Sequence, residues 1–242
     1  MRSDKMEIIK VKDSDELGKK AAEIVAAKIK EQNESILGLA TGSTPEKMYA
    51  NLIEDYNAGD LSFSNTTTFN LDEYAGLASD HPNSYRYYMD HNLFNHIDIE
   101  KQKTYIPNGT ANDLEAECTH FEELIKQTGT IDLQLIGLGL NGHIGFNEPG
   151  TSFDERTHVV RLKQSTRAVN ARFFPSLNDV PKLALTMGIA TILEAKQILF
   201  LVQGEHKADI LKKVVHGDVT EDVPASVLQT HPNVILLTDI DI

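Results

Sequence analysis

The chain has 242 residues, of which 40% are hydrophobic, and this combination fits one sizeable α/β domain with a large buried core. Its formal net charge of −13 disfavours binding to nucleic acid or to an anionic membrane surface. The single cysteine, Cys118, excludes an intramolecular disulfide and is expected to pack inside a helix. The sequence contains neither an apolar signal core nor an apolar run long enough to cross a bilayer, so we expect a cytoplasmic protein.

Apolar runs of strand length alternate with segments of helical period, which predicts a doubly wound, mostly parallel, Rossmann-like α/β sheet with helices on both faces. No linker or internal repeat divides the sequence, so a single domain should span residues 1–242. The predicted strands are 7–11, 35–40, 66–70, 133–138, 182–186, 197–202 and 233–237. The predicted helices are 15–32, 45–56, 85–94, 113–127, 189–194 and 207–215. Ligands bind beyond the carboxyl ends of the strands in such sheets, so polar residues that directly follow strands are candidate site residues.

The first such segment, Thr41-Gly42-Ser43-Thr44-Pro45, lies between a predicted strand and a predicted helix. Free backbone N–H groups, the helix dipole and three hydroxyls would suit a phosphate there, although an ordinary turn with a Ser or Thr cap fits equally well. Arg172 and Lys207 are candidate cations for the same phosphate. Taken singly, each of these two residues is better explained as a solvated surface charge.

Asp72 directly follows the third predicted strand and is a candidate general base. A carboxylate near its ordinary pKa of about 3.9 is a weak base unless it is positioned against an acidic C–H and partly desolvated. Capping of the following turn is the simpler role for Asp72 when the residue is taken alone. Glu73 is an alternative functional acid, and the spacing does not decide between the two.

A glycine-rich turn after the fourth predicted strand, residues 138–150, holds His143 together with Asn141 and Glu148. Histidine exchanges protons near neutral pH, and the two neighbours can fix its tautomer and raise its basicity. No H-x-x-x-H pattern or cysteine pair accompanies His143, so we do not expect a metal site at this turn.

Gly137, Gly139 and Gly142 also spell the G-x-G-x-x-G pattern of dinucleotide-binding proteins. That pattern requires a helix that opens at the third glycine and an acidic residue at the end of the next strand. Gly145 and Pro149 interrupt any helix from Gly142, so we do not expect a dinucleotide site.

With these segments assembled, the sequence resembles the glucosamine-6-phosphate deaminase family, also called glucosamine-6-phosphate isomerases, along nearly its whole length. The matching segments are 39–45 (LATGSTP), 69–74 (FNLDEY), 81–85 (HPNSY), 142–149 (GHIGFNEP), Thr166-Arg167 and 170–174 (NARFF). The resemblance implies conversion of D-glucosamine 6-phosphate and water to D-fructose 6-phosphate and ammonium without a metal or organic cofactor.

The resemblance also implies a role for each candidate residue. His143 would open the pyranose ring with the help of Glu148 and Asn141, and Asp72 would move a proton from C2 to C1. The phosphate would be held by Gly42, Ser43, Thr44, Arg172 and Lys207. The segment 151–181 would form a lid over the sugar, although its length alone fits a surface excursion as well.

Two departures from the family pattern carry expectations of their own. Some relatives have Asp in place of Asn141, and an Asn supplies no negative charge, so His143 should be less basic here than beside two carboxylates. Larger hexameric relatives are activated by N-acetylglucosamine 6-phosphate through basic residues that align near His158 and Val160. Those positions lack fixed positive charge here, so we expect an unregulated monomer or small homo-oligomer whose only partner is a small sugar phosphate.

Other functions remain compatible with the sequence. Galactosamine-6-phosphate deaminases and 6-phosphogluconolactonases share the implied fold and phosphate site, and the sequence does not reveal the preferred C4 stereochemistry. A sugar-phosphate-sensing module is the alternative from another class, but the acid–base residues and the lack of an attached helix-turn-helix disfavour it.

Overall fold

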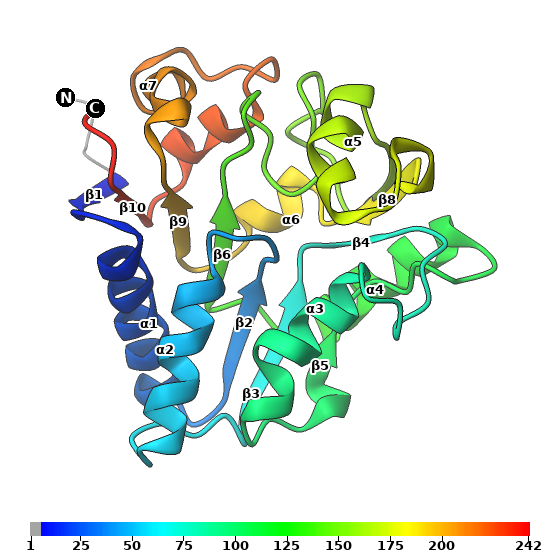
Figure 1. Cartoon of the computed structure of the whole chain (residues 1–242). Coiled ribbons are helices and arrows are strands. Elements are labelled where there is room, and N and C mark those ends of the chain that lie inside the picture. The colour runs from blue at the N-terminus through cyan, green and yellow to red at the C-terminus, as the bar shows by residue number, and fades with distance from the viewer. Residues whose placement is uncertain (1–5) are drawn as a thin grey trace.

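The computed structural model describes residues 6–242 and confirms a mostly parallel α/β fold (Figure 1). Its main sheet has seven strands in the order β1-β10-β9-β6-β2-β3-β5, and every neighbouring pair is parallel. These strands are β1 (Met6–Lys10), β2 (Ser35–Leu39), β3 (Thr66–Asn70), β5 (Thr104–Tyr105), β6 (Leu133–Gly137), β9 (Ile198–Val202) and β10 (Val234–Thr238). Except for 182–186, every predicted strand lies in this sheet.

Helices connect the strands, and α1 and α2 lie side by side across one face of the sheet (Figure 1). The α-helices are α1 (Ser14–Glu31), α2 (Glu46–Asn57), α3 (Tyr85–Asn92), α4 (Leu114–Thr128), α5 (Gln164–Asn170), α6 (Ile189–Leu193) and α7 (Ala208–His216). Asp13 and Asp113 begin α1 and α4 by accepting hydrogen bonds from free amides of the first turn. Short 3-10 helices are η1 (Phe94–His96), η2 (Lys101–Lys103), η3 (Ala171–Phe173), η4 (Leu177–Asp179), η5 (Glu205–Lys207) and η6 (Pro224–Thr230).

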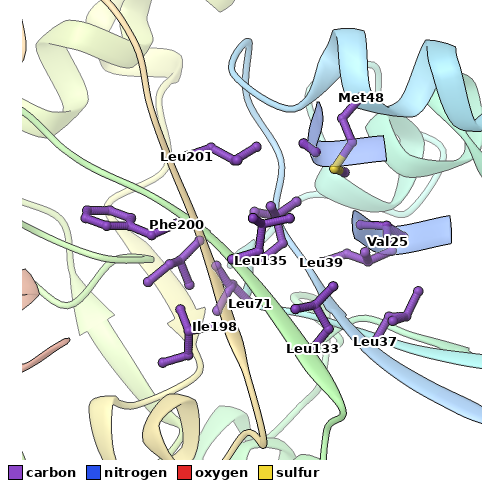
Figure 2. Packing of buried hydrophobic residues seen from close by; sticks show 14 of the residues in the cluster. Val25, Leu37, Leu39, Met48, Leu71, Leu133, Leu135, Ile198, Phe200 and Leu201 are labelled. Atoms are coloured by element: carbon purple, nitrogen blue, oxygen red, sulfur yellow. The ribbon is translucent and has the colours of Figure 1, made fainter. Parts of the chain in front are cut away.

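The core forms where aliphatic side chains of the central strands meet the helices. Figure 2 shows Val25 of α1 and Met48 of α2 beside Leu37 and Leu39 of β2. On the opposite side of the strand β3, Phe69 packs edge-to-face on Phe121 of α4, with ring centroids 5.7 Å apart. Helices therefore cover both faces of the sheet, as the continuous apolar strands predict. Cys118 is buried in α4, as expected.

The prediction that 182–186 joins the parallel sheet is wrong. This segment forms β8 (Leu183–Thr186) in a separate antiparallel sheet, between β4 (Asp72–Tyr74) and β7 (His158–Arg161). β8 is apolar and buried like a central strand, so its composition reveals burial but not which strands it pairs with. The short strand β5 takes the edge position of the main sheet, and its two residues are too few for a sequence signal.

The second sheet, with α5, η3 and η4, forms a small lobe at the carboxyl-end edge of the main sheet (Figure 1). The chain crosses into the lobe immediately after β3, because Leu71 still bonds the main sheet while Asp72 already pairs with β8. Along residues 6–242, every helix is too short or too polar to cross a bilayer.

Candidate active site

The strand order reverses direction between β2 and β6, because β2 leads to β3 on one side and β6 pairs with β9 on the other. Such a switch point opens a crevice beyond the carboxyl ends of the strands. A cavity of about 580 Å³ lies there, lined by segments that directly follow β2, β3, β6 and β9 and by part of the small lobe. This volume lies in the range of small-molecule sites.

One wall of the cavity is the loop between β2 and α2. Gly42 adopts φ +96°, a conformation that favours glycine, and its carbonyl accepts a 2.7 Å hydrogen bond from the Tyr88 hydroxyl. The amides of Gly42, Ser43 and Thr44 donate to no group in residues 6–242, so they remain free for a ligand or solvent. Free amides before a helix N-terminus are suited to an anion.

Two cations line the same cavity from other elements. Lys207, in η5 after β9, is half-buried, and this burial lowers the pKa of its ammonium while nearby Asp239 raises it. Arg172 lies in η3 of the small lobe, is exposed, and stacks its guanidinium 4.7 Å from the centroid of the Phe173 ring. The structure thus gathers the five predicted phosphate residues around one cavity.

The two acids that follow β3 have different surroundings. Glu73 accepts hydrogen bonds from the amides of Tyr74, Tyr85 and Arg86, at 2.8, 2.9 and 2.9 Å, and so satisfies free amides at the start of α3. Asp72 lines the cavity, is only 7% exposed, and its carboxylate accepts no hydrogen bond from residues 6–242. The geometry therefore gives Glu73 a structural role and leaves Asp72 available for chemistry.

Burial, together with the smaller effect of the negative charge of Glu73, raises the pKa of Asp72 to about 8. A carboxylate with a raised pKa is a stronger base once it has lost its proton. Asp72 owes this environment to its place at the junction of the two sheets, beside the end of β8.

His143 reaches Glu148 through Asn141. The imidazole Nδ1 lies 2.6 Å from the Asn141 Oδ1, and the Asn141 Nδ2 donates a 2.7 Å hydrogen bond to the Glu148 Oε2. Since a carboxylate only accepts, the amide of Asn141 must turn its nitrogen to Glu148 and its oxygen to His143. Nδ1 then carries the proton, and Nε2 is left with a free lone pair.

Burial lowers the pKa of His143, and Lys207 and Lys163 lower it further, whereas Glu148 raises it. The ring is therefore neutral at neutral pH and can accept a proton. It packs so closely on the Cα of Gly139 that a Cβ there would lie 2.2 Å from the imidazole Nε2. Gly139 thus serves the placement of His143, and no helix follows Gly142 in residues 142–150, so the dinucleotide pattern has no structural counterpart.

The cavity also has lining residues that the sequence did not single out as site residues, among them Tyr85, Thr166, Asn170, Gln203 and His206. Tyr85 and Thr166 lie in segments that carry the family resemblance, so the sequence could have identified them as site residues. For Gln203 and His206, the only sequence evidence was their position after a predicted strand. Glu148, in contrast, lies behind the cavity wall and contacts it through Asn141. Within residues 6–242, no three His, Cys, Asp or Glu side chains are arranged to hold a metal ion.

The fold and the cavity together define an α/β protein in which the titratable side chains of Asp72 and His143 lie beside a loop of free amides. Comparison with known proteins makes the class specific. The chain belongs to the family of glucosamine-6-phosphate isomerases and 6-phosphogluconolactonases, whose model matches residues 12–236.

Curated relatives at high identity carry the deaminase name. The chain is 57% identical over 236 residues to the glucosamine-6-phosphate deaminase of Geobacillus sp. (strain WCH70). The aligned region covers 98% of this chain and 94% of that protein. It is 53% identical to glucosamine-6-phosphate deaminase 1 of Bacillus subtilis (strain 168), with 97% of each chain covered.

Solved structures divide into near and distant matches. A monomeric glucosamine-6-phosphate deaminase matches with a TM-score of 0.95 and 53% identity, over 96% of this chain and 97% of that one. The 6-phosphogluconolactonase of Thermotoga maritima matches with a TM-score of 0.76 and 19% identity, over 96% of this chain and 99% of that one. The second likeness shows the shared fold alone.

Proposed function

We propose that the protein converts D-glucosamine 6-phosphate and water to D-fructose 6-phosphate and ammonium, in the catabolism of amino sugars. The observation that carries the proposal is the single cavity in which His143 and a carboxylate with a raised pKa, Asp72, lie with an anion-binding loop. Relatives at 53–57% identity are glucosamine-6-phosphate deaminases, which supports this reaction over that of the lactonases.

The reaction begins with substrate binding and ring opening. The free amides of Gly42, Ser43 and Thr44, with Arg172 and Lys207, hold the phosphate and so orient the sugar. The Nε2 of His143 takes the proton of the C1 hydroxyl and returns a proton to the ring oxygen, which gives the open-chain aldehyde. Glu148 stabilises the transient positive charge on the ring through Asn141.

Isomerisation and deamination follow. Asp72, as the carboxylate, takes the proton from C2 and generates an enolamine, and it then returns the proton to C1. The resulting imine at C2 is hydrolysed by one water molecule, which supplies the carbonyl oxygen of fructose 6-phosphate, and nitrogen leaves as ammonium. The substrate supplies the ammonium cation, whose charge favours ionisation of Asp72 when it is bound nearby.

We also infer the setting in which the enzyme works. Residues 151–181 contribute α5 and η3 of the small lobe to the cavity lining, and we propose that this segment acts as a lid over the sugar. The whole of residues 1–242 forms one catalytic domain in this proposal. We propose a cytoplasmic enzyme that is a monomer or a small homo-oligomer and that uses no metal or organic cofactor.

The test is release of ammonium and fructose 6-phosphate from glucosamine 6-phosphate in chelator-treated buffer. Asp72→Asn and His143→Gln should each lower kcat by roughly 10²- to 10⁴-fold, because each removes a general acid–base group. Asp60→Asn, at an exposed turn, is the matched control and should keep full activity. Sugar-phosphate binding without turnover in the wild type would indicate a sensor instead.

Two further substrates separate the enzymes that share this fold. Galactosamine 6-phosphate tests the stereochemistry at C4, and 6-phosphogluconolactone tests hydrolysis without C–H abstraction. Lactone hydrolysis that survives Asp72→Asn, with no release of ammonium by the wild type, would assign the protein to the lactonases.

A further inference from the structure

Glu148 receives a second hydrogen bond that comes from a different part of the chain than Asn141. The hydroxyl of Thr166, in α5 of the small lobe, donates to Oε1, while Asn141 donates to Oε2. Thr166 is 7% exposed and Glu148 is 5% exposed, so solvent does not replace either donor easily. Both oxygens of this buried carboxylate are therefore fixed by protein groups.

The beginning of α5 makes a second contact with the glycine-rich turn, residues 138–150. Lys163, the residue before α5, donates from Nζ to the carbonyl of Pro149 at 3.1 Å. The beginning of α5 thus contacts the two consecutive residues Glu148 and Pro149. It thereby links the small lobe to the series of hydrogen bonds that joins Glu148, Asn141 and His143.

We propose that Thr166 is a positioning residue for the hydrogen bonds that join Glu148, Asn141 and His143. It acts through Glu148 and determines which ring nitrogen of His143 carries the proton. The inference rests on the proposed function for its kinetic consequences but not for its geometry. The Thr166 hydroxyl keeps the Glu148 carboxylate in the orientation in which Oε2 accepts from Asn141. That contact in turn keeps the Asn141 oxygen on the Nδ1–H of His143.

Loss of the hydroxyl has a definite chemical consequence. The Glu148 carboxylate loses one of its two donors and rotates more freely. A displaced Glu148 no longer orders the Asn141 amide, which can then present its NH₂ to Nδ1. His143 would carry its proton on Nε2, where it cannot accept one from the sugar.

The variants Thr166→Val and Thr166→Ser test the proposal. Thr166→Val is nearly isosteric and removes only the hydroxyl, so kcat should fall roughly tenfold or more, as for loss of one hydrogen bond to a charged group. KM should change less than twofold, and the acid limb of the pH–rate profile should move to lower pH, because a displaced Glu148 raises the pKa of His143 less. Thr166→Ser restores the donor and should restore both kcat and the pH profile.

Thr151→Val is the matched control. Its hydroxyl also donates to Glu148, at 2.7 Å, but to the main-chain carbonyl, which keeps a second donor in the Thr151 amide. Kinetics of Thr166→Val that match those of Thr151→Val would overturn the proposal. Equal losses in Thr166→Val and Thr166→Ser would overturn it too, because they would indicate packing rather than the hydroxyl.

A second measurement tests the role of Thr166 independently of the proposed reaction. ¹⁵N chemical shifts of the His143 ring report which nitrogen is protonated, whether or not the protein turns over glucosamine 6-phosphate. We expect Nδ1–H in the wild type and in Thr166→Ser, and a population with Nε2–H in Thr166→Val. Wild-type inactivity with this pattern would refute only the proposed reaction, whereas an unchanged tautomer in Thr166→Val would refute the role of Thr166.

Discussion

The main sheet and the small lobe differ in the size of their buried hydrophobic cores. The main sheet lies in one large cluster of buried side chains, to which β9 contributes five fully buried residues. The small lobe has its own cluster of only four buried residues, Tyr74, Phe146, Leu162 and Ala184, with partly exposed aromatic rings around it. The first region has the extensive burial expected of a stable scaffold, whereas the sparse burial of the second predicts a lower local stability.

The proposed catalytic groups lie where these two regions meet. Asp72 is the first residue of β4, directly after the last contact with the main sheet, and Glu148 is hydrogen bonded to α5. The anion-binding loop, by contrast, belongs wholly to the scaffold, between β2 and α2. Under the proposed function, the comparison teaches that substrate anchoring depends on the extensively buried region, whereas proton transfer depends on how the small lobe is placed against it.

The largest expected effect contrasts the two cores. Phe200→Ala, in the centre of β9, should lower the free energy of unfolding by about 3–5 kcal/mol, because it leaves a cavity in close-packed surroundings. Phe174→Ala, in the small cluster, should lower the free energy of unfolding by only about 1 kcal/mol, because its ring is only partly buried. Urea unfolding measures both, with exposed Phe173→Ala as the control. Equal losses in the free energy of unfolding for Phe200→Ala and Phe174→Ala would show that the two cores do not differ as described.

A second prediction concerns stability at the junction. The pKa of Asp72 is raised to about 8 in the fold from 3.8, so wild-type stability should fall as pH rises from about 4 to about 8. Asp72→Asn removes this cost, and its Tm should exceed the wild-type Tm by roughly 3–8 °C at pH 8.5 and by almost nothing at pH 4. Thermal unfolding at the two pH values measures the difference, with Asp60→Asn as the control. A gain that is the same at both pH values would contradict the buried, unpaired carboxylate.

A smaller effect should follow from a second acid beside His143. Asn141→Asp places two carboxyl groups within hydrogen-bonding distance of each other, since the Asn141 Nδ2 lies 2.7 Å from the Glu148 Oε2. The added negative charge should raise the pKa of His143, against the effect of burial, and move the acid limb of kcat/KM to higher pH by about one unit. A pH–rate profile that Asn141→Asp leaves unchanged would refute the argument.

The smallest expected effect is no response at all, and it tests whether the small lobe carries regulation. His158 and Val160 lie in β7, neither side chain carries a fixed positive charge, and the His158 ring bonds the Arg156 carbonyl through Nδ1. N-acetylglucosamine 6-phosphate should therefore leave the substrate dependence of the rate unchanged. A lowered half-saturation concentration in its presence would contradict the prediction, as would sedimentation of a hexamer.

The sequence predicted the main sheet well for a physical reason. Strands that are buried on both faces must be continuously apolar, and the loops that follow them must supply the polar groups of any site, so both features are local. Residues 41–45 and 138–150 could be selected on that ground alone. The short strands β4, β5 and β7 were missed, because two to four residues carry too little periodicity to be distinguished from loop.

Sequence by itself therefore determined the fold class, the edge of the sheet where a ligand binds and the residue types available there. Only the tertiary structure decided which of two adjacent acids faces the cavity, because Glu73 is engaged by amides that begin a helix twelve residues later. It also decided that β8 pairs with β4 and that Thr166 bonds Glu148, eighteen residues away. These outcomes depend on contacts between distant segments, which local composition and spacing do not encode.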